Sequence, residues 1–429
     1  MMFCKESEFQ DSPISKIPED WKIQELSDFV EIETGKRAKG GGLSEGTVAS
    51  IGGEHIDGQG NILWSDMKYI PDDFYNLLKQ GRVQIGDILL VKDGATTGKV
   101  AIVKYLKYEK VAVNEHVFLI RSKTERLSNE FLYYFLFSVF GQRQIRTRFH
   151  GLIGGIIRND LENVLVPIPS LVEQRGVVGV LGVVDSAIGL VDKVIAKTER
   201  LKKGLMQTLL TRGIEHKEYK ETPIGKITKE WDVKRLEEAS KEVTIGVVNP
   251  ATPYYTSAND GVPYFRSQNV RENRLEPTNV YVRPEFNERH PRSVLKENDI
   301  LTLQTGFIGV SCIVPKEYEG ANCHSLLITR TNPKMLNPQF LCQFLNSAVG
   351  KKIINRHNSG WGRAHLLLED FRRISIPLPP LQEQQTIAEI LSTIDKRIKL
   401  ERKEKTRLER IKRGLMDLLL TGKVRVRVD

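Results

Sequence analysis

The chain has 429 residues, enough for two or three domains of ordinary size, and 40% of them are hydrophobic. Its formal net charge of +10 favours a polyanionic partner without identifying one. The sequence has no 18-residue apolar run typical of a membrane span and no apolar signal-peptide core near its start, so we expect a cytoplasmic protein. The four cysteines show neither a CxxC pair nor a metal-ligand spacing with histidine, and we expect reduced thiols and no metal site.

The sequence repeats itself with a shift of 210 residues. Three motifs occur twice: P-I/L-P-x-L-x-E-Q at 167–174 and 377–384, GLMxxLLT at 204–211 and 414–421, and P-I-x-K-I followed by tryptophan at 13–21 and 223–231. A constant shift over so many positions indicates an internal duplication.

In chain order, the duplication predicts alternating variable and helical segments. These are an N-terminal segment at 1–22 that belongs to a circular repeat, a variable module at 23–165, a spacer helix at 166–213, a connector at 214–232, a second variable module at 233–375, and a second spacer helix with a C-terminal tail at 376–429. In both modules, short apolar runs alternate with glycine and asparagine turns, which predicts strand-rich domains.

The two spacer segments show the heptad spacing of a coiled coil. The seam residues are Leu181, Val184, Ile188 and Val191 in the first copy, and Leu391, Ile394, Ile398 and Leu408 in the second. Glu401 and Lys405 interrupt the second seam. Each segment has about 40 residues and would form a helix of roughly 60 Å. The prolines before each segment prevent the helix from extending back into the module.

These elements predict an α+β protein with an internal pseudo-twofold repeat. Two mixed, strand-rich globular domains are separated by two long helices, which cover their apolar seams by forming an antiparallel coiled coil.

Loops that differ between the two modules supply the candidate DNA-binding residues. They are Lys36, Arg37, Lys39, His55, Arg146, Arg148, His150 and Arg158 in the first module, and Arg266, Gln268, Asn269, Arg271, Arg356, His357, Arg363 and His365 in the second. Arginine can grip phosphate or the edge of guanine, while glutamine and asparagine suit adenine. A phosphate or plain surface contact is the more common role for any one of them, but as a set they are typical of two sequence readers.

Motifs that would indicate catalysis are incomplete. GATTGK at 94–99 lacks a spacer residue and the final Ser or Thr of a phosphate loop, so we expect a turn between strands. NPQF at 337–340 lacks the second proline of an amino-methyltransferase motif, and we expect Asn337 to cap a helix instead. Glu173 and Glu383 fall in the first turn of the spacer helices, where a carboxylate interacts favourably with the helix dipole. No catalytic residues are assigned.

With its twice-written motifs, the chain resembles the DNA-specificity subunit of type I restriction-modification systems over essentially its whole length. The resemblance implies two target recognition domains that each read one half of a bipartite DNA target, and helices that set the half-site spacing and dock methyltransferase subunits. The implied partners are double-stranded DNA, two methyltransferase subunits and, through them, two restriction subunits with helicase activity. The resemblance also implies a subunit that is not catalytic and holds no cofactor. S-adenosylmethionine, ATP and Mg²⁺ would bind the partner subunits of a complex that methylates adenine and cleaves DNA.

Two other functions remain to be compared with this one. A fused adenine methyltransferase would need a glycine-rich cofactor loop and an Asn- or Asp-Pro-Pro-aromatic motif, which the sequence lacks. A coiled-coil DNA-binding or assembly scaffold outside a restriction system would need no divergent recognition loops, and it predicts similar loops in both modules.

Overall fold

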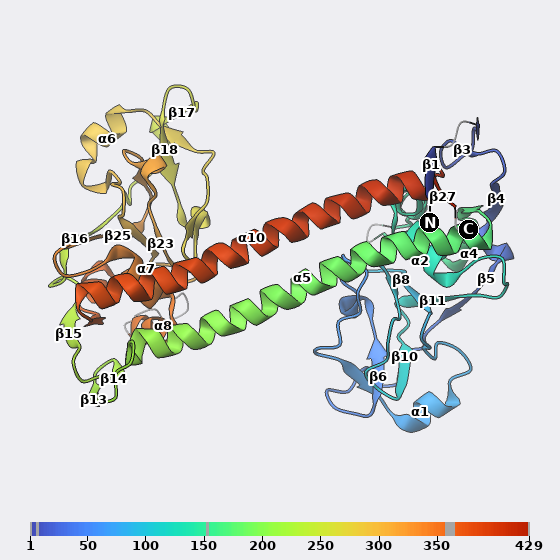
Figure 1. The fold of residues 1–429 in the computed structure, drawn as a ribbon, viewed down its shortest axis with the longest axis horizontal. Coiled ribbons are helices and arrows are strands. Elements are labelled where there is room, and N and C mark those ends of the chain that lie inside the picture. The colour runs from blue at the N-terminus through green and yellow to red at the C-terminus, as the bar shows by residue number, and fades with distance from the viewer. Residues whose placement is uncertain (1, 6–7, 152–153, 357–364, 428–429) are drawn as a thin grey trace. The chain divides into compact units, whose positions relative to one another are not determined.

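The computed structural model describes residues 2–5, 8–151, 154–356 and 365–427, and the chain divides into two compact units (Figure 1). The first unit comprises Met1–Asp192 and Lys403–Asp429, and the second comprises Lys193–Arg402. Each unit joins one strand-rich module to a segment of each of two long helices, α5 (Leu171–Arg212) and α10 (Leu381–Leu419). No helix among the described residues is long and apolar enough to cross a membrane.

The module of the first unit contains two sheets and a helical layer. A four-stranded antiparallel sheet has the order β5 (Val30–Thr34), β11 (Val117–Ser122), β8 (Ile88–Val91) and β9 (Val100–Ile102). The second sheet has the order β10 (Lys110–Val113), β6 (Val48–Ile51) and β7 (Lys68–Ile70), with β10 and β6 parallel. The helices of this module are α1 (Asp72–Leu77), α2 (Asn129–Phe137), α3 (Val139–Arg146) and α4 (Arg158–Glu162).

Strand β8 shows how the sequence creates these layers. Ile88 and Leu90 belong to a core shared with α2 and α5, whereas Leu89 and Val91 belong to a core shared with β6 and β10. Successive side chains of a strand point to opposite faces, so four consecutive apolar residues form a strand that is buried on both sides. The four-stranded sheet is therefore the middle layer of the module.

The second unit repeats this arrangement. Its antiparallel sheet has the order β16 (Ser240–Ile245), β25 (Leu326–Thr331), β22 (Ile300–Leu303) and β23 (Ser311–Ile313). Its other sheet has the order β17 (Tyr255–Thr256), β21 (Tyr281–Val282), β18 (Val262–Phe265) and β24 (Asn322–Cys323), and β18 and β24 are parallel. A hairpin of β19 (Val270–Arg271) and β20 (Arg274–Leu275) and the helices α6 (Glu285–Arg289), α7 (Pro338–Asn346), α8 (Ala348–Arg356) and α9 (Leu368–Arg372) complete it. The matching strand orders confirm the predicted repeat.

Within the first unit, the segments of α5 and α10 run antiparallel. Lys412 Nζ lies 2.6 Å from Asp185 Oδ1, and Lys405 Nζ lies 2.7 Å from Asp192 Oδ1. Moving seven residues forward along α5, from 185 to 192, therefore corresponds to moving seven residues back along α10, from 412 to 405. Lys405 interrupts the apolar seam because its amine pairs with a carboxylate of the other helix.

The predicted seam residues are buried to different degrees. Leu181 and Leu391 are fully buried, and Ile398 is 8% exposed. The others are partly buried: Val184, Ile188, Val191, Ile394 and Leu408.

The glutamine of the repeated E-Q motif ties each module to its long helix. Gln384 is fully buried, and its Oε1 accepts a hydrogen bond from the amide of Asn337 at 2.8 Å. Its Nε2 donates to the carbonyl oxygens of Met335 and Pro379, both at 2.8 Å. Gln174 repeats this role in the first unit by accepting from the amide before α2 at 2.9 Å. The motif therefore recurs because each copy secures the start of a module helix. The Asn337 side chain also caps α7 as predicted, accepting from two backbone amides at 2.8 and 3.0 Å.

The glutamate of the same motif does more than interact with the helix dipole. Glu173 accepts a hydrogen bond from the indole nitrogen of Trp21 at 3.2 Å, and Glu383 accepts one from Trp231 at 2.9 Å. Glu383 also lies 2.9 Å from His216 Nε2. The dipole interpretation is incomplete, because each carboxylate satisfies a buried indole donor that belongs to the repeated P-I-x-K-I motif and its tryptophan.

Short strand pairs flank this contact in both units. Before α5, β12 (Leu165–Ile168) pairs with β4 (Lys22–Glu25), and before α10, β26 (Ser375–Leu378) pairs with β15 (Asp232–Arg235). A hairpin precedes each tryptophan, formed by β2 (Phe9–Gln10) and β3 (Ile17–Pro18) or by β13 (Tyr219–Thr222) and β14 (Gly225–Thr228).

The two chain termini meet in the first unit. Strand β1 (Met2–Lys5) pairs antiparallel with β27 (Val424–Arg427), and N and C lie next to each other in Figure 1. Arg425 on β27 donates to both carboxylate oxygens of Glu173, at 2.6 and 2.8 Å, and to those of Asp20, at 2.9 Å each. In the first unit, the β1–β27 strand pair and the ion pairs of Arg425 thus connect the segment after α10 to the segment before Trp21. In the second unit the chain itself makes the corresponding connection, because it continues from α5 to the segment before Trp231.

Candidate nucleic-acid interface

In the first module, the loop at residues 92–99 connects β8 to β9, which confirms the predicted turn. Other loops converge on it. The carbonyl oxygen of Lys92 accepts a hydrogen bond from the amide of Ile156 at 2.7 Å, and the hydroxyl of Thr96 donates to the carbonyl oxygen of Gly53 at 3.3 Å. We use the name first loop edge for the described residues of six segments: 35–42, 52–56, 92–99, 114–116, 150–151 and 154–156.

Charged side chains connect further segments to the first loop edge. His116 Nδ1 lies 2.5 Å from Asp93 Oδ1, and Arg37 Nε lies 3.6 Å from Glu115 Oε1. Lys36, Arg37 and Lys39 are exposed. The structure therefore brings the predicted basic loop to the same edge as Asp93 and His116, which the sequence reasoning missed. The difference between VKDG at 91–94 and LQTG at 303–306 was the available signal.

His55 and Asn269 are corrections to the candidate set, because both side chains are buried. They are 3% and 5% exposed. His55 Nδ1 accepts from the amide of Gly52 at 2.9 Å, and Asn269 Oδ1 accepts from the amide of Arg266 at 3.0 Å. Each side chain is buried and closes a short 3-10 turn by this hydrogen bond, so neither side chain is available to a partner. Glu54 is exposed in the first turn, and Ser267 and Gln268 are exposed in the second.

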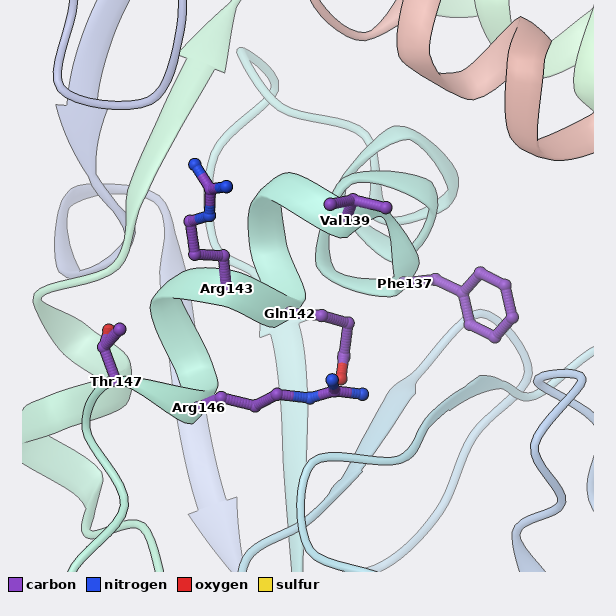
Figure 2. A pocket seen from close by; sticks show the side chains of 6 residues that line it. All are labelled: Phe137, Val139, Gln142, Arg143, Arg146 and Thr147. Carbon is purple, nitrogen blue, oxygen red and sulfur yellow. The ribbon is translucent and has the colours of Figure 1, made fainter.

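A hollow of about 540 Å³ lies beside α3 in the first module (Figure 2). Phe137, Val139, Gln142, Arg143, Arg146 and Thr147 line it. Figure 2 shows the side chains of Gln142 and Arg146 on the same side as the Phe137 ring, with Arg143 directed away from them. Gln142 Nε2 donates to the carbonyl oxygen of Gly98 at 2.9 Å, which joins the hollow to the loop at 92–99. The Gln142 amide also donates to the carbonyl oxygen of Leu136 at 2.9 Å, so the Arg146 guanidinium is the group here that can donate to a phosphate.

The other basic candidates of the first module contact the protein itself. Arg148 is partly buried and donates to the carbonyl oxygens of Gln144 and Asn163, at 2.8 and 3.1 Å. His150 lies 2.8 Å from Asp160, and Arg158 lies 2.7 Å from a carboxylate one helical turn away. Arg148 therefore anchors the end of α3, whereas His150 and Arg158 remain exposed at the surface.

The second module presents the matching edge. The carbonyl oxygen of Gln304 accepts from the amide of Leu366 at 2.8 Å, and Gln304 Nε2 donates to the carbonyl oxygen of Ser325 at 3.0 Å. Thr305 forms an isolated antiparallel bridge with His365. We call residues 246–251, 265–269, 304–310, 324–325 and 365–366 the second loop edge. The loops thus converge in corresponding places in both modules, but their side chains differ.

The remaining candidates of the second module are distributed unevenly. Arg266 lies on the second loop edge, and among the described residues its buried Nε has no hydrogen-bond partner. Gln268 and Arg271 are exposed beside it. Arg356 is exposed at the end of α8 and donates to the carbonyl oxygen of Pro223 at 3.2 Å. His357 and Arg363 lie outside the described residues.

Sequence reasoning also missed Phe307, which is 82% exposed at the tip of the β22–β23 loop. Gly306 and Gly309, with φ of +72° and +81°, shape the turn that presents it. The first module has Ala95 in the aligned position.

Within the described residues, no group of three or more His, Cys, Asp or Glu side chains could hold a metal ion. Cys312, Cys323 and Cys342 are buried free thiols. Burial raises the pKa of Cys342 to about 12, so this thiol stays protonated and is a poor nucleophile at neutral pH.

Two similar modules, each carried on paired helices and each presenting a different set of loops, define a protein with two recognition domains. The chain belongs to the family of type I restriction modification DNA specificity domains, which it matches twice, over residues 18–200 and 228–410.

Relatives and solved structures agree with this assignment. The chain is 29% identical over 443 residues to a Methanocaldococcus jannaschii protein named as the MjaX type I restriction enzyme specificity subunit, covering 100% of this chain and 99% of the relative. It is 29% identical over 442 residues to the MjaVIII specificity subunit of the same organism, covering 100% and 98%. The crystal structure of a type I restriction-modification S subunit from M. genitalium has the same fold, with a TM-score of 0.58, 16% identity and coverage of 95% and 98%. The predicted specificity subunit and its doubled architecture are confirmed.

Proposed function

We propose that each module reads one half of a bipartite double-stranded DNA target and that the long helices set the spacing between the half-sites. The observation that carries this proposal is the pair of loop edges: the same frame holds both, yet their side chains differ. Two modules with the same fold but different loops fit the recognition of two different DNA sequences. A scaffold that makes one repeated contact would need similar loops in both modules.

The loop edges have the chemistry that DNA recognition needs. The exposed lysines and arginine of the first edge can neutralise phosphates, a contact that positions a protein on DNA without reading its sequence. On the second edge, Arg266 and Gln268 can donate to guanine and adenine in the major groove. We therefore assign contacts with the DNA phosphate backbone to Lys36, Arg37 and Lys39, and contacts with base edges to Arg266 and Gln268.

The helices are proposed to dock two methyltransferase subunits and, through them, two restriction subunits. Large apolar side chains are exposed along both helices: Val183, Leu190, Leu201 and Leu400 are 71%, 62%, 57% and 62% exposed. Three of them lie on α5 and Leu400 lies on α10, and exposed apolar residues along a helix are typical of a protein interface. The catalytic groups and the S-adenosylmethionine, ATP and Mg²⁺ are assigned to those partners, and the complex to the cytoplasm, where its DNA lies.

Selection from random double-stranded DNA tests this function. The chain is purified with its methyltransferase partner, bound fragments are enriched over several rounds, and the survivors are sequenced. We expect two short conserved blocks separated by unread positions of fixed number. A single contiguous block would contradict two readers, and no enrichment over the methyltransferase alone would favour a coiled-coil scaffold outside a restriction system.

A further inference from the structure

In the first unit, one carboxylate joins three elements. Asp185 lies on α5, and its Oδ1 is 2.6 Å from the Lys412 amine on α10. Its Oδ2 accepts a hydrogen bond from the Tyr134 hydroxyl on α2, a helix of the module, at 2.9 Å. Lys104 Nζ lies 3.8 Å from the same oxygen. One oxygen of Asp185 therefore contacts the other long helix, and the second contacts the module.

The second unit contains the same joint with the roles of the two helices exchanged. Asp395 lies on α10, and its Oδ1 is 2.6 Å from Lys202 Nζ on α5. Its Oδ2 accepts from Gln343 Nε2 on α7 at 2.9 Å, and Asn273 Nδ2 lies 3.5 Å away. The aspartate and the lysine recur at the 210-residue shift.

The module residue of the joint differs between the units. Tyr134 and Gln343 occupy the same place in the aligned stretches FLYYFL and FLCQFL. A phenol and an amide differ in shape and charge distribution, but each directs a hydrogen-bond donor at the aspartate. The geometry is thus repeated although the residue type is not, which indicates that the contact itself matters.

Burial makes the joint of the first unit sensitive to the register of the helices, and that of the second unit, whose Lys202 and Asp395 side chains are 15% and 31% exposed, less so. The side chains of Lys412 and Asp185 are only 9% and 13% exposed. A slip by one helical turn would move the lysine by about 5.4 Å and leave two charges unpaired in the interior. Buried polar pairs of this kind are known to fix the register of paired helices. The groups that face Asp185 are Lys412, Lys104 and Tyr134. Burial, and after it the charge of Asp185, raises the pKa of the Tyr134 hydroxyl far above its ordinary value, so this hydroxyl keeps its proton and remains a hydrogen-bond donor.

We propose that Asp185 and Asp395 are positioning residues for the spacing of the DNA target: each fixes the register of the helix pair through one oxygen and the orientation of a module on that pair through the other. This inference rests on the proposed bipartite recognition. Adding one base pair to a spacer shifts a half-site by about 3.4 Å and rotates it by roughly 34°. A module held by a directed hydrogen bond resists that rotation, and one without it can follow the displaced half-site.

The test uses the complex of full-length chain and methyltransferase partner, with targets that keep both half-sites and vary the spacer by one base pair either way. Tyr134→Phe removes the module's hydrogen bond to Asp185, and Gln343→Met removes the one to Asp395 together with the hydrogen bond that Gln343 Oε1 accepts from Asn273 at 3.2 Å. Tyr133→Phe is the matched control, because it removes a neighbouring hydroxyl from the same helix without touching the hydrogen bond to Asp185. Thermal unfolding confirms that each variant is folded.

We expect the control to keep the parent's discrimination between spacers, and Tyr134→Phe and Gln343→Met each to reduce it about tenfold or more, the scale of a hydrogen bond to a charged group. Binding to each isolated half-site should be unchanged, which a general loss of structure would not produce. If the parent discriminates sharply between spacers and both variants do so equally, the inference is wrong while the proposed function stands. If the parent recognises no bipartite target, both are wrong.

Discussion

Replacing Arg330 by methionine should strongly destabilise the second unit. Asp299, next to β22, is almost completely buried, and Arg330 Nε lies 3.2 Å from its Oδ2. The same guanidinium lies 2.6 Å from Glu242 and donates to the carbonyl oxygen of Val294 at 2.7 Å. Methionine fills similar space but removes every one of these donors. Among the described residues, the hydrogen bond then left to the Asp299 carboxylate is the one from the backbone amide of Lys296, at 2.9 Å.

The magnitude follows from the burial of the carboxylate. The side chains of Asp299 and Arg330 are 4% and 11% exposed. Removing one partner of a buried ion pair costs about 3–5 kcal/mol because the other charge stays in the interior without compensation. The matched control is Lys229→Met, whose pair with Glu218 is 66% and 71% exposed; this substitution should cost less than about 1 kcal/mol.

The loss of stability caused by Arg330→Met should be larger at neutral pH than at acidic pH. Burial raises the pKa of Asp299 above its ordinary value even with Arg330 present, and the arginine opposes this effect. A carboxyl group whose pKa is higher in the folded state binds its proton more tightly there. Stability therefore falls as the pH rises from the unfolded pKa towards the folded one. Removing Arg330 raises the folded pKa further, so the destabilisation should be greatest at neutral pH and shrink on acidification.

Hydrogen exchange measured by mass spectrometry can follow the second unit on its own. Amides of β22 and β25 should exchange roughly 150-fold to several thousandfold faster in Arg330→Met than in the parent chain at pH 7, after correction for intrinsic rates. The difference should narrow at pH 5. An acceleration no greater than that of Lys229→Met, or an equal one at both pH values, would refute the reasoning.

Substitutions at three further positions test the interface and the repeated motif. Arg266→Ala should cost about 1–3 kcal/mol of discrimination at one base pair of the second half-site and leave the first half-site unchanged, as measured with single-base target variants. Arg146→Ala should weaken binding to all sequences alike and lower the slope of log affinity against log salt by about one; an altered base preference would argue against a phosphate contact. Glu383→Ala should destabilise the second unit by about 1–3 kcal/mol for each buried donor left unpaired, including the Trp231 indole. Glu383→Gln should destabilise it less, because one acceptor oxygen remains. Equal losses of stability for the two variants in denaturation experiments would contradict this account.

The doubled plan of the chain could be predicted because it depends on local patterns. The spacer segments were predicted to begin at 166 and 376, whereas the long helices begin at Leu171 and Leu381, because residues 165–168 and 375–378 form short strands before the last prolines. The seam predicted that the helices pair, and the expected antiparallel direction is shown within the first unit by the two ion pairs Asp185–Lys412 and Asp192–Lys405.

Contacts between distant segments could not be predicted in the same way. Asp93 and His116 come from separate loops, and only the sheet order brings their side chains together. His55 was misassigned because a histidine that closes a 3-10 turn looks the same in sequence as one on the surface. The tryptophan that binds Glu173 lies 152 residues away, so the purpose of the motif was visible only in the fold.

The most direct test of the central claim is to exchange one module. Residues 233–375 are replaced by the corresponding module of another family member with a different target, and the selection from random DNA is repeated. We predict that one block of the bipartite target changes to that of the donor while the other block and the spacer length stay as in the parent chain. A change in both blocks, or in neither, would contradict independent recognition by two modules.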